Sequence, residues 1–275
     1  GTTAASAALL SDVIDGKATA DVDTIAKIQA LATAAKVVIS YDDPSTDIPP
    51  TKDQINVLVQ GQTVGGNPVP AVTDAALAQV QAAIDAANSD GTPLATQADV
   101  AAVVKAAMDA YTAALNTIAD YAETGAVAPA DTDYTAAGVI GVNSGNLAAI
   151  NSAINAQPGT DTTVGNANDR DAADTTAEVQ AIVNAYQAIL DEANGAGADL
   201  SAQDPTVTQY AAIGVTGVDA GAEETLLGDV IGRKVTADVD TVGEVQTLAD
   251  TVAKVIAAAG SGTAPTESEL TSLGL

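Results

Sequence analysis

Acidic side chains are the residues of this chain whose type and spacing could do chemistry. The chain contains no His and no Cys, so the commonest general base and the thiolate nucleophile are both missing. Asp residues instead occur in alternating pairs, with one residue between the two carboxylates. Oxygen ligands of this kind are what a hard cation such as Ca²⁺ prefers. The pairs are Asp21 with Asp23, Asp131 with Asp133, Asp169 with Asp171, and Asp238 with Asp240.

Two interpretations of these pairs are open. Asp21, Asp23, Asp238 and Asp240 are candidate calcium ligands. Alternatively, Asp23 and Asp240 flank predicted helix starts, where a carboxylate satisfies free amides and complements the helix dipole. Calcium takes about six to eight oxygen ligands, and no segment offers that many, nor an EF-hand or nonapeptide calcium repeat. We favour capping and expect no cofactor, with calcium as the alternative.

Catalysis is not predicted. The sequence lacks the glycine-rich dinucleotide fingerprint, the phosphate-binding loop and the nucleophile elbow. Its acids fall at helix starts and in loops, where capping and solvation explain them. Bundles with thin cores also rarely form the enclosed pocket that an active site needs. We therefore expect that the protein is not an enzyme and assign no catalytic residue.

The charge balance excludes several classes of partner. Acidic residues number 36 and basic residues 9, a formal net charge of −27. Nucleic acids and anionic membrane surfaces need Lys and Arg, so neither is an expected partner. No apolar run approaches the roughly 18 residues of a membrane-spanning helix, and no membrane insertion is predicted for this segment. The apolar residues are mainly Ala, Val, Ile and Leu, with aromatics at 2%, which favours narrow helical bundles.

An internal repeat organises the chain. The segment 9–24, LLSDVIDGKATADVDT, matches LLGDVIGRKVTADVDT at 226–241 in twelve of sixteen positions, at an offset of 217 residues. GVIGV at 138–142 recurs as GVTGV at 214–218. DTTAEVQ at 174–180 has relatives at 240–246 and 23–29. Repetition of this kind indicates consecutive copies of one supersecondary unit.

Capping signals set the helix starts. Pro50, Pro205 and Pro265 are each followed by Thr and, three residues after that Thr, by Gln or Glu, which is the pattern of a capping box. The copy at Pro129 departs, with Ala130 in place of Thr. Gly138, Gly214 and Gly274 then stand where a left-handed helix cap favours glycine. These signals predict a short first helix in each copy.

Two longer helices are predicted after each short one. The second has apolar residues at helical spacing, as in Leu77, Val80 and Ile84. The third opens at the Asp-Thr signature, where Thr175 with Glu178 and Thr241 with Glu244 repeat the capping box. Tyr111, Tyr186 and Tyr210 lie on apolar stripes, so we expect core packing for them. The polar, Gly-rich segments 61–73 and 157–173 are predicted to be surface loops.

The sequence therefore predicts an all-α fold, a tandem array of small three-helix bundle modules that form an elongated rod. The inter-module contacts are expected at Tyr41 and Tyr121, which fall near junctions, and at the module-start prolines Pro50, Pro129, Pro205 and Pro265. The predicted modules are 1–41 (second and third helices only), 49–124, 129–195, 205–259, and 265–275 (a first helix only). Because 265–275 followed by residue 1 onward nearly rebuilds a module, we expect the parent protein to continue on both sides.

The pattern resembles a known class of repeats. The run YTAAGVIGVNSGNLAAINSAI at 134–154, followed by DTTAEVQAIV, looks like the Ala/Asp/Thr-rich repeats of very large bacterial surface proteins and adhesins. It is also similar to GA-like three-helix modules. The resemblance implies a three-helix fold and an extracellular or bacterial cell-surface location, in fibres or biofilm. It supplies no albumin-contact surface for these residues.

A structural or adhesive role follows as the leading hypothesis. The chain would act as a spacer rod or fibre building block, with neighbouring modules of the same protein as partners and head-to-tail self-assembly as one form of that partnership. One alternative is a binding module that recognises a host or matrix protein. The other is a calcium-binding, stiffened repeat.

Overall fold

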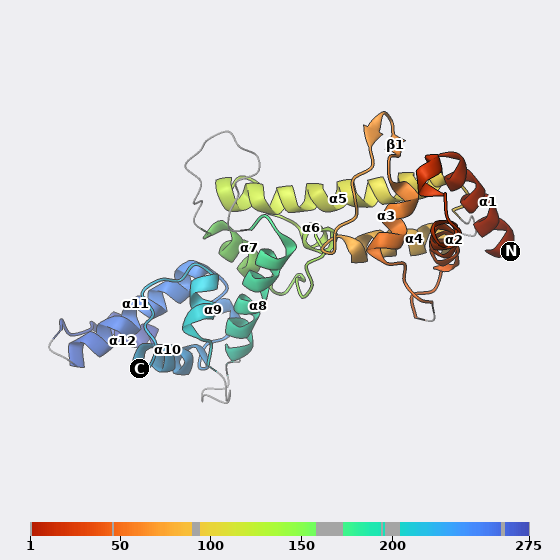
Figure 1. Cartoon of the computed structure of the whole chain (residues 1–275). Coiled ribbons are helices and arrows are strands. Elements are labelled where there is room, and N and C mark those ends of the chain that lie inside the picture. The colour runs from red at the N-terminus through yellow and green to blue at the C-terminus, as the bar shows by residue number, and fades with distance from the viewer. Residues whose placement is uncertain are drawn as a thin grey trace. The chain divides into compact units, whose positions relative to one another are not determined.

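The described chain is mostly helical. The structure is a computed structural model, and it describes residues 2–45, 47–89, 94–157, 173–193, 195, 204–259 and 262–274. These residues form twelve α-helices, two single-turn 3-10 helices and one pair of two-residue strands (Figure 1). The coarse prediction of a helical fold is confirmed. The predicted loop 157–173 and the pair Asp169 and Asp171 lie almost wholly outside the described residues.

The helices recur in a fixed order along the chain: short, medium, long. The first medium and long helices are α1 (Thr2–Asp15) and α2 (Ile25–Ser40). The next set is α3 (Lys52–Val59), α4 (Leu77–Ser89) and α5 (Gln97–Thr124). It is followed by α6 (Asp131–Ala136), α7 (Leu147–Asn155) and α8 (Thr176–Glu192). The last are α9 (Val207–Ala212), α10 (Ala222–Ile231), α11 (Val242–Ala259) and the short α12 (Glu267–Ser272). The 3-10 turns η1 (Thr19–Asp21) and η2 (Thr236–Asp238) occupy equivalent places before α2 and α11.

The predicted caps form. Thr51, Thr206 and Thr266 each accept the amide three residues on, and the Gln or Glu there accepts the amide of the Thr in return. Thr175 and Thr241 do the same at the long helices α8 and α11. At the divergent copy, Asp133 still accepts the Ala130 amide at 2.8 Å. Gly138, Gly214 and Gly274 all have positive φ, as the predicted left-handed caps require.

One predicted loop contains a hairpin. Within 61–73, β1 (Thr63–Val64) pairs antiparallel with β2 (Asn67–Pro68), and Val64 faces Asn67. Gly65 and Gly66 between them have φ of 59° and 82°. Two consecutive positive φ values are what a tight hairpin turn requires. The glycines that indicated an irregular loop therefore form a turn.

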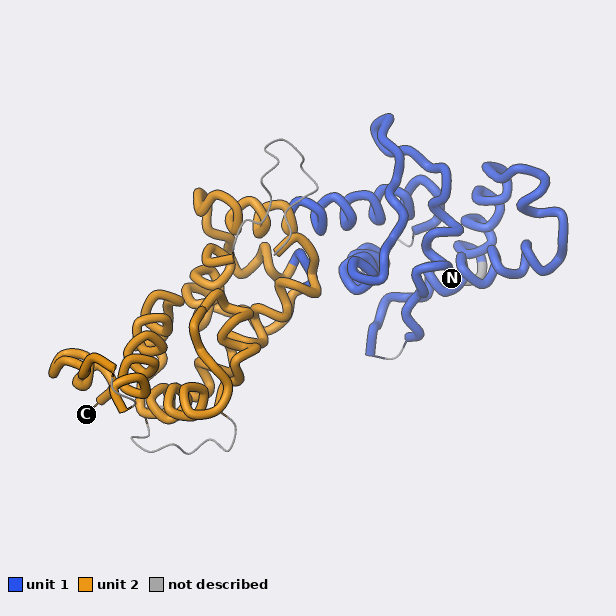
Figure 2. Tube along the Cα trace, turned by 60° about the vertical axis from the view of Figure 1, so that its left-hand side comes forward, with its two compact units in different colours: residues 1–113, 136–138 blue, residues 114–135, 139–275 orange. Residues whose placement is uncertain are grey.

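The chain divides into two compact units, and the boundary falls within α5 (Figure 2). Unit 1 contains residues 1–113 and 136–138. In it, α2 is central, because it packs against α1, α3 and α4. The buried side chains of this unit include Leu9, Val38, Ile55, Leu58 and Ile84.

Unit 2, which contains residues 114–135 and 139–275, repeats this scheme. Its helix α8 packs against α7, α9 and α10, as α2 packs against α1, α3 and α4. Helix α11 packs against α7, α10 and α12. The short helices α3, α9 and α12 thus each contact the long helix that precedes them, across a limit between two predicted modules. The module limits themselves stay predictions.

Among the described helices, none is both long and apolar enough to cross a membrane.

Candidate interaction surfaces between repeats

Two of the prolines at the repeat starts, Pro50 and Pro129, are anchored by the following medium helix. Gln81 of α4 donates its side-chain amide to the Pro50 carbonyl at 2.8 Å. Asn151 of α7 donates to the Pro129 carbonyl at 2.9 Å. The two donors occupy the same position of the repeat. Pro50, Pro129 and Pro205 are buried, whereas Pro265 is only half-buried.

The Pro205 copy uses a different arrangement at this position. The residue equivalent to Asn151 is Gly228, and a Cβ placed there would lie 2.6 Å from Asp204 Cβ. Glycine is thus required by the close approach of Asp204, the residue before Pro205. In this copy Glu224 of α10 accepts the Val207 amide at 2.9 Å and ties the short helix to the medium one.

One hydrogen bond recurs three times between a medium helix and the next short helix. Just after the medium helix, Lys17, Gln157 and Lys234 each donate a side-chain N–H to a backbone carbonyl. The acceptors are Val57 (2.8 Å), Ala212 (3.0 Å) and Ser272 (2.6 Å). All three acceptors stand seven residues after the proline of their copy. The same junction is therefore built three times, once in unit 1 and twice in unit 2.

A second recurring contact seats the start of a long helix against a medium helix of the preceding repeat. In unit 1, the amide of Gln97, the first residue of α5, donates to Asp12 of α1 at 2.7 Å. In unit 2, the amide of Val242, the first residue of α11, donates to Ser152 of α7 at 2.9 Å. Asp12 and Ser152 are equivalent positions. Each supplies an acceptor to an amide that has no partner inside its own helix.

A glutamine on each long helix of unit 2 binds the glycine-rich turn. Gln180 accepts the Ile140 amide at 2.8 Å and donates to the Ile140 carbonyl at 3.1 Å. Gln246 makes the same pair of bonds with Thr216, at 2.8 and 3.0 Å. These bonds attach GVIGV and GVTGV to the starts of α8 and α11. The equivalent residue on α2 is Gln29, which is exposed.

The predicted junction tyrosines lie in different surroundings. Tyr41 is buried, and its carbonyl accepts the side chain of Asn88 at 3.0 Å. Asn88 also donates to the Val38 carbonyl at 2.7 Å, so it joins α4 to the end of α2. Burial, with Asp85 and Asp47 nearby, raises the pKa of Tyr41. Tyr121 is half-buried on α5, and it contributes, after burial itself, to the raised pKa of Tyr134.

Tyrosines of the described stripes are buried core residues, as predicted for Tyr111, Tyr186 and Tyr210. Tyr134 donates its hydroxyl to Asn151 at 2.6 Å, and Tyr186 donates to the Val239 carbonyl at 3.0 Å. The Tyr210 hydroxyl is buried without a hydrogen-bond partner among the described residues. Burial raises the pKa of Tyr134, Tyr186 and Tyr210.

The candidate calcium ligands take part in local contacts. Asp23 forms an ion pair with Lys27 at 2.8 Å. Asp238 accepts the Val235 amide at 3.2 Å, and Asp21 is exposed in η1. Partial burial and the neighbouring Glu244 raise the pKa of Asp240. In the part of the chain that the structure describes, no three His, Cys, Asp or Glu residues gather into a group that could hold a metal ion. Calcium binding stays a hypothesis.

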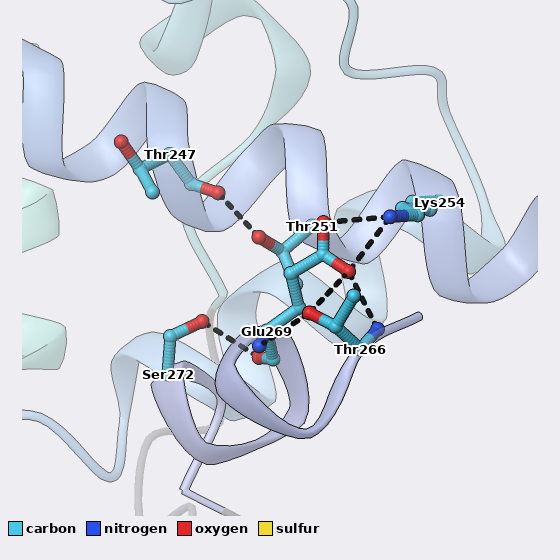
Figure 3. A network of polar contacts seen from close by, with 6 residues as sticks. All are labelled: Thr247, Thr251, Lys254, Thr266, Glu269 and Ser272. Atoms are coloured by element: carbon cyan, nitrogen blue, oxygen red, sulfur yellow. Dashed lines mark hydrogen bonds and ion pairs between the residues drawn. The ribbon is translucent and has the colours of Figure 1, made fainter. Parts of the chain in front are cut away.

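The short helix α12 is held on α11 by a polar network (Figure 3). Lys254 contacts both carboxylate oxygens of Glu269 at 2.7 Å. Glu269 also accepts the amide and hydroxyl of Thr266. The bond from Lys254, and after it the two from Thr266, lower the pKa of Glu269 to about 2. Ser272 closes the last turn by donating to the Glu269 carbonyl.

Several junction residues have no role in the sequence-based predictions. They are the donors Lys17, Gln157 and Lys234, the acceptors Asp12 and Ser152, and the amides Gln81, Gln180 and Gln246. Two signals for them are nonetheless present in the sequence. Lys17 recurs as Lys234 at the 217-residue offset, and Gln180 and Gln246 close the Asp-Thr pattern. Asp12 likewise recurs as Asp229 at that offset. Gln81, Ser152 and Gln157 change type between copies, so only packing reveals their equivalence.

Comparisons with known proteins give no relative. A scan of protein-family models, a search of curated proteins and a search of solved structures each returned no match.

Proposed function

We propose that this chain is a structural segment of a large extracellular or cell-surface bacterial protein, in which consecutive three-helix repeats form a spacer rod or fibre block. The observation that carries the proposal is the hydrogen bond made by Lys17, Gln157 and Lys234. Each of these bonds connects one copy of the repeat to the short helix of the next. A unit that is joined to its successor in the same way at three junctions is the basis of a linear repeat architecture.

The surface chemistry supports the same role. A formal net charge of −27 would keep neighbouring rods apart from side to side. Physiological salt screens this repulsion beyond roughly 8 Å. The linkers between copies are short, and the short helices pack on the preceding long helix. Such a chain would hold the parts of the protein at its two ends at a defined distance from each other.

Small-angle X-ray scattering of dilute monomer tests the proposal. A globule of this length has a radius of gyration of about 19 Å. A rod of repeats gives a clearly larger value and a scattering curve with a linear cross-section region. A radius near that of a globule would reject the spacer. Protease accessibility of the segment on intact cells would test the extracellular location.

A further inference from the structure

The start of α2 is uncovered, whereas the equivalent starts of α5 and α11 are buried. Ile25, the first residue of α2, is 75% exposed, while the equivalent Gln97 and Val242 are 5% and 8% exposed. Ile28, one turn further on, is 37% exposed, while its equivalents are fully buried. Those equivalents are Val100, Val179 and Val245.

The medium helix α1 continues this uncovered surface. Leu10 and Ile14 are half-buried. The equivalent pairs on the three other medium helices are all fully buried: Val80 and Ile84, Ile150 and Ile154, Leu227 and Ile231. We call Leu10, Ile14, Ile25 and Ile28 the N-terminal face. Three of its four positions are fully buried in every other described copy, and the Ile25 position is buried in the copies that start α5 and α11.

A matching cleft lies on α10, α11 and α12. It has a volume of about 160 Å³ and is lined by Leu226, Asp229, Val230, Arg233, Val255 and Leu273. We call it the C-terminal cleft. Its equivalent in unit 1, formed by α1, α2 and α3, is filled by Gln97. That residue donates its backbone amide to Asp12 and its side-chain amide to the Leu58 carbonyl at 2.5 Å.

Residues around the C-terminal cleft are under-packed in the same way. Val255 and Leu226 are half-buried, whereas their unit 1 equivalents Val38 and Leu9 are fully buried. On α12, Leu270 is half-buried, and the equivalent Ile55, Tyr134 and Tyr210 are fully buried. Asp229 occupies the position of Asp12 and Ser152, which accept a helix-start amide in both units.

We propose that two copies of this chain associate head to tail, with the N-terminal face of one copy seated in the C-terminal cleft of the other. Ile25 takes the place of Gln97 and Val242, and its backbone amide donates to the Asp229 carboxylate. A carboxylate at a helix start is also favoured by the helix dipole. The partner is a second copy because the chain already makes this contact twice within itself. The inference rests on the proposed function, since it names how one segment continues into the next.

Sedimentation velocity over a concentration series gives the first test. The wild-type chain should sediment faster as concentration rises. Ile25→Asp places a carboxylate opposite Asp229 and should weaken association several-fold. This variant should still fold, because the site is exposed and Asp suits the first turn of a helix. Ile140→Asp is the matched control, since Ile140 is 74% exposed and belongs to neither surface, and it should associate like the wild type.

Cysteine pairing gives the direction of the contact, since the chain has no native Cys. Ile25→Cys mixed with Asp229→Cys should form a disulfide-linked heterodimer in mildly oxidising buffer, several-fold above Ile140→Cys mixed with Asp229→Cys. Ser152→Cys with Val242→Cys in one chain is the positive control for this geometry. A concentration-independent monomer, or equal cross-linking in both mixtures, would overturn the proposal.

Different outcomes would reject the spacer proposal and the head-to-tail proposal. An extended monomer in scattering that neither associates nor cross-links keeps the spacer and rejects the head-to-tail contact. Specific cross-linking of chains that scatter as globules keeps the contact and rejects the rod.

Discussion

The segments 9–40 and 226–257 begin with nearly the same sixteen residues, yet they differ in burial. Both fold into a medium helix, a 3-10 turn and a long helix: α1, η1 and α2 in one, α10, η2 and α11 in the other. Ile28 is partly exposed while the equivalent Val245 is fully buried. The difference arises because α11 starts against α7 and the Thr216 turn, and the described residues place nothing equivalent at the start of α2. The repeated sequence sets the helices and turns of both segments, whereas the burial of a position is set by the element that packs against it.

Truncation of one matched isoleucine should show the largest effect. Ile231→Ala removes a fully buried side chain and should cost about 2–5 kcal/mol of unfolding free energy. Ile14→Ala, at the equivalent position 217 residues earlier, should cost about half of that or less. Its side chain is only half-buried, so the truncation removes less buried apolar area. Denaturant titration with hydrogen exchange of α1 and α10 measures both. Equal losses would contradict the comparison.

Gly228 and Ser11 form a second matched pair. Gly228→Ala forces a Cβ against Asp204, and such overpacking should cost about 1–3 kcal/mol. Ser11→Ala lies on an exposed part of α1 and should stay within about 0.5 kcal/mol of the wild type. Thermal unfolding of the two variants compares them. A tolerated Gly228→Ala would show that Asp204 is free to move away.

The glutamine that binds the glycine-rich turn should matter only where the turn is present. Gln246→Ala removes both bonds to Thr216 and should cost about 0.5–1.5 kcal/mol. Gln29→Ala removes an exposed side chain and should be close to neutral. Exchange protection of the Thr216 amide gives a local readout. If Gln29→Ala also lowered the protection of the Thr216 amide, Gln29 would have a role outside its own helix, contrary to the comparison.

Acid should release α12 before it affects α3. The pKa of Glu269 is about 2 when α12 is docked, below its usual 4.5. Its contribution is therefore complete above pH 4.5 and is lost as the pH falls through 4.5 towards 2. The equivalent residue on α3 is Gln54, which does not titrate. Methyl NMR of Leu273 and Leu58 between pH 6 and 2 follows the two helices, and Glu269→Gln should remove the difference. Simultaneous loss of both signals would contradict the assignment.

Local chemistry made part of this fold predictable from sequence. The capping boxes at Thr51, Thr206 and Thr266 and the glycine cap at Gly214 involve residues only a few positions apart. Such interactions are decided within a short segment whatever lies around it. The hairpin turn at Gly65 and Gly66 is equally local, but the polar, Gly-rich composition of 61–73 led to the prediction of a surface loop there.

The sequence by itself determined the helices, their starts and their recurrence, because these depend on side-chain periodicity and on hydrogen bonds within one turn. Only the tertiary structure decided which copy of the repeat packs against which other copy. Lys17 and Val57 are forty residues apart and Asp12 and Gln97 eighty-five, and no local pattern specifies such a pair. Burial at Ile25 and Val242 depends on what packs against each helix start, and neither residue specifies that by itself.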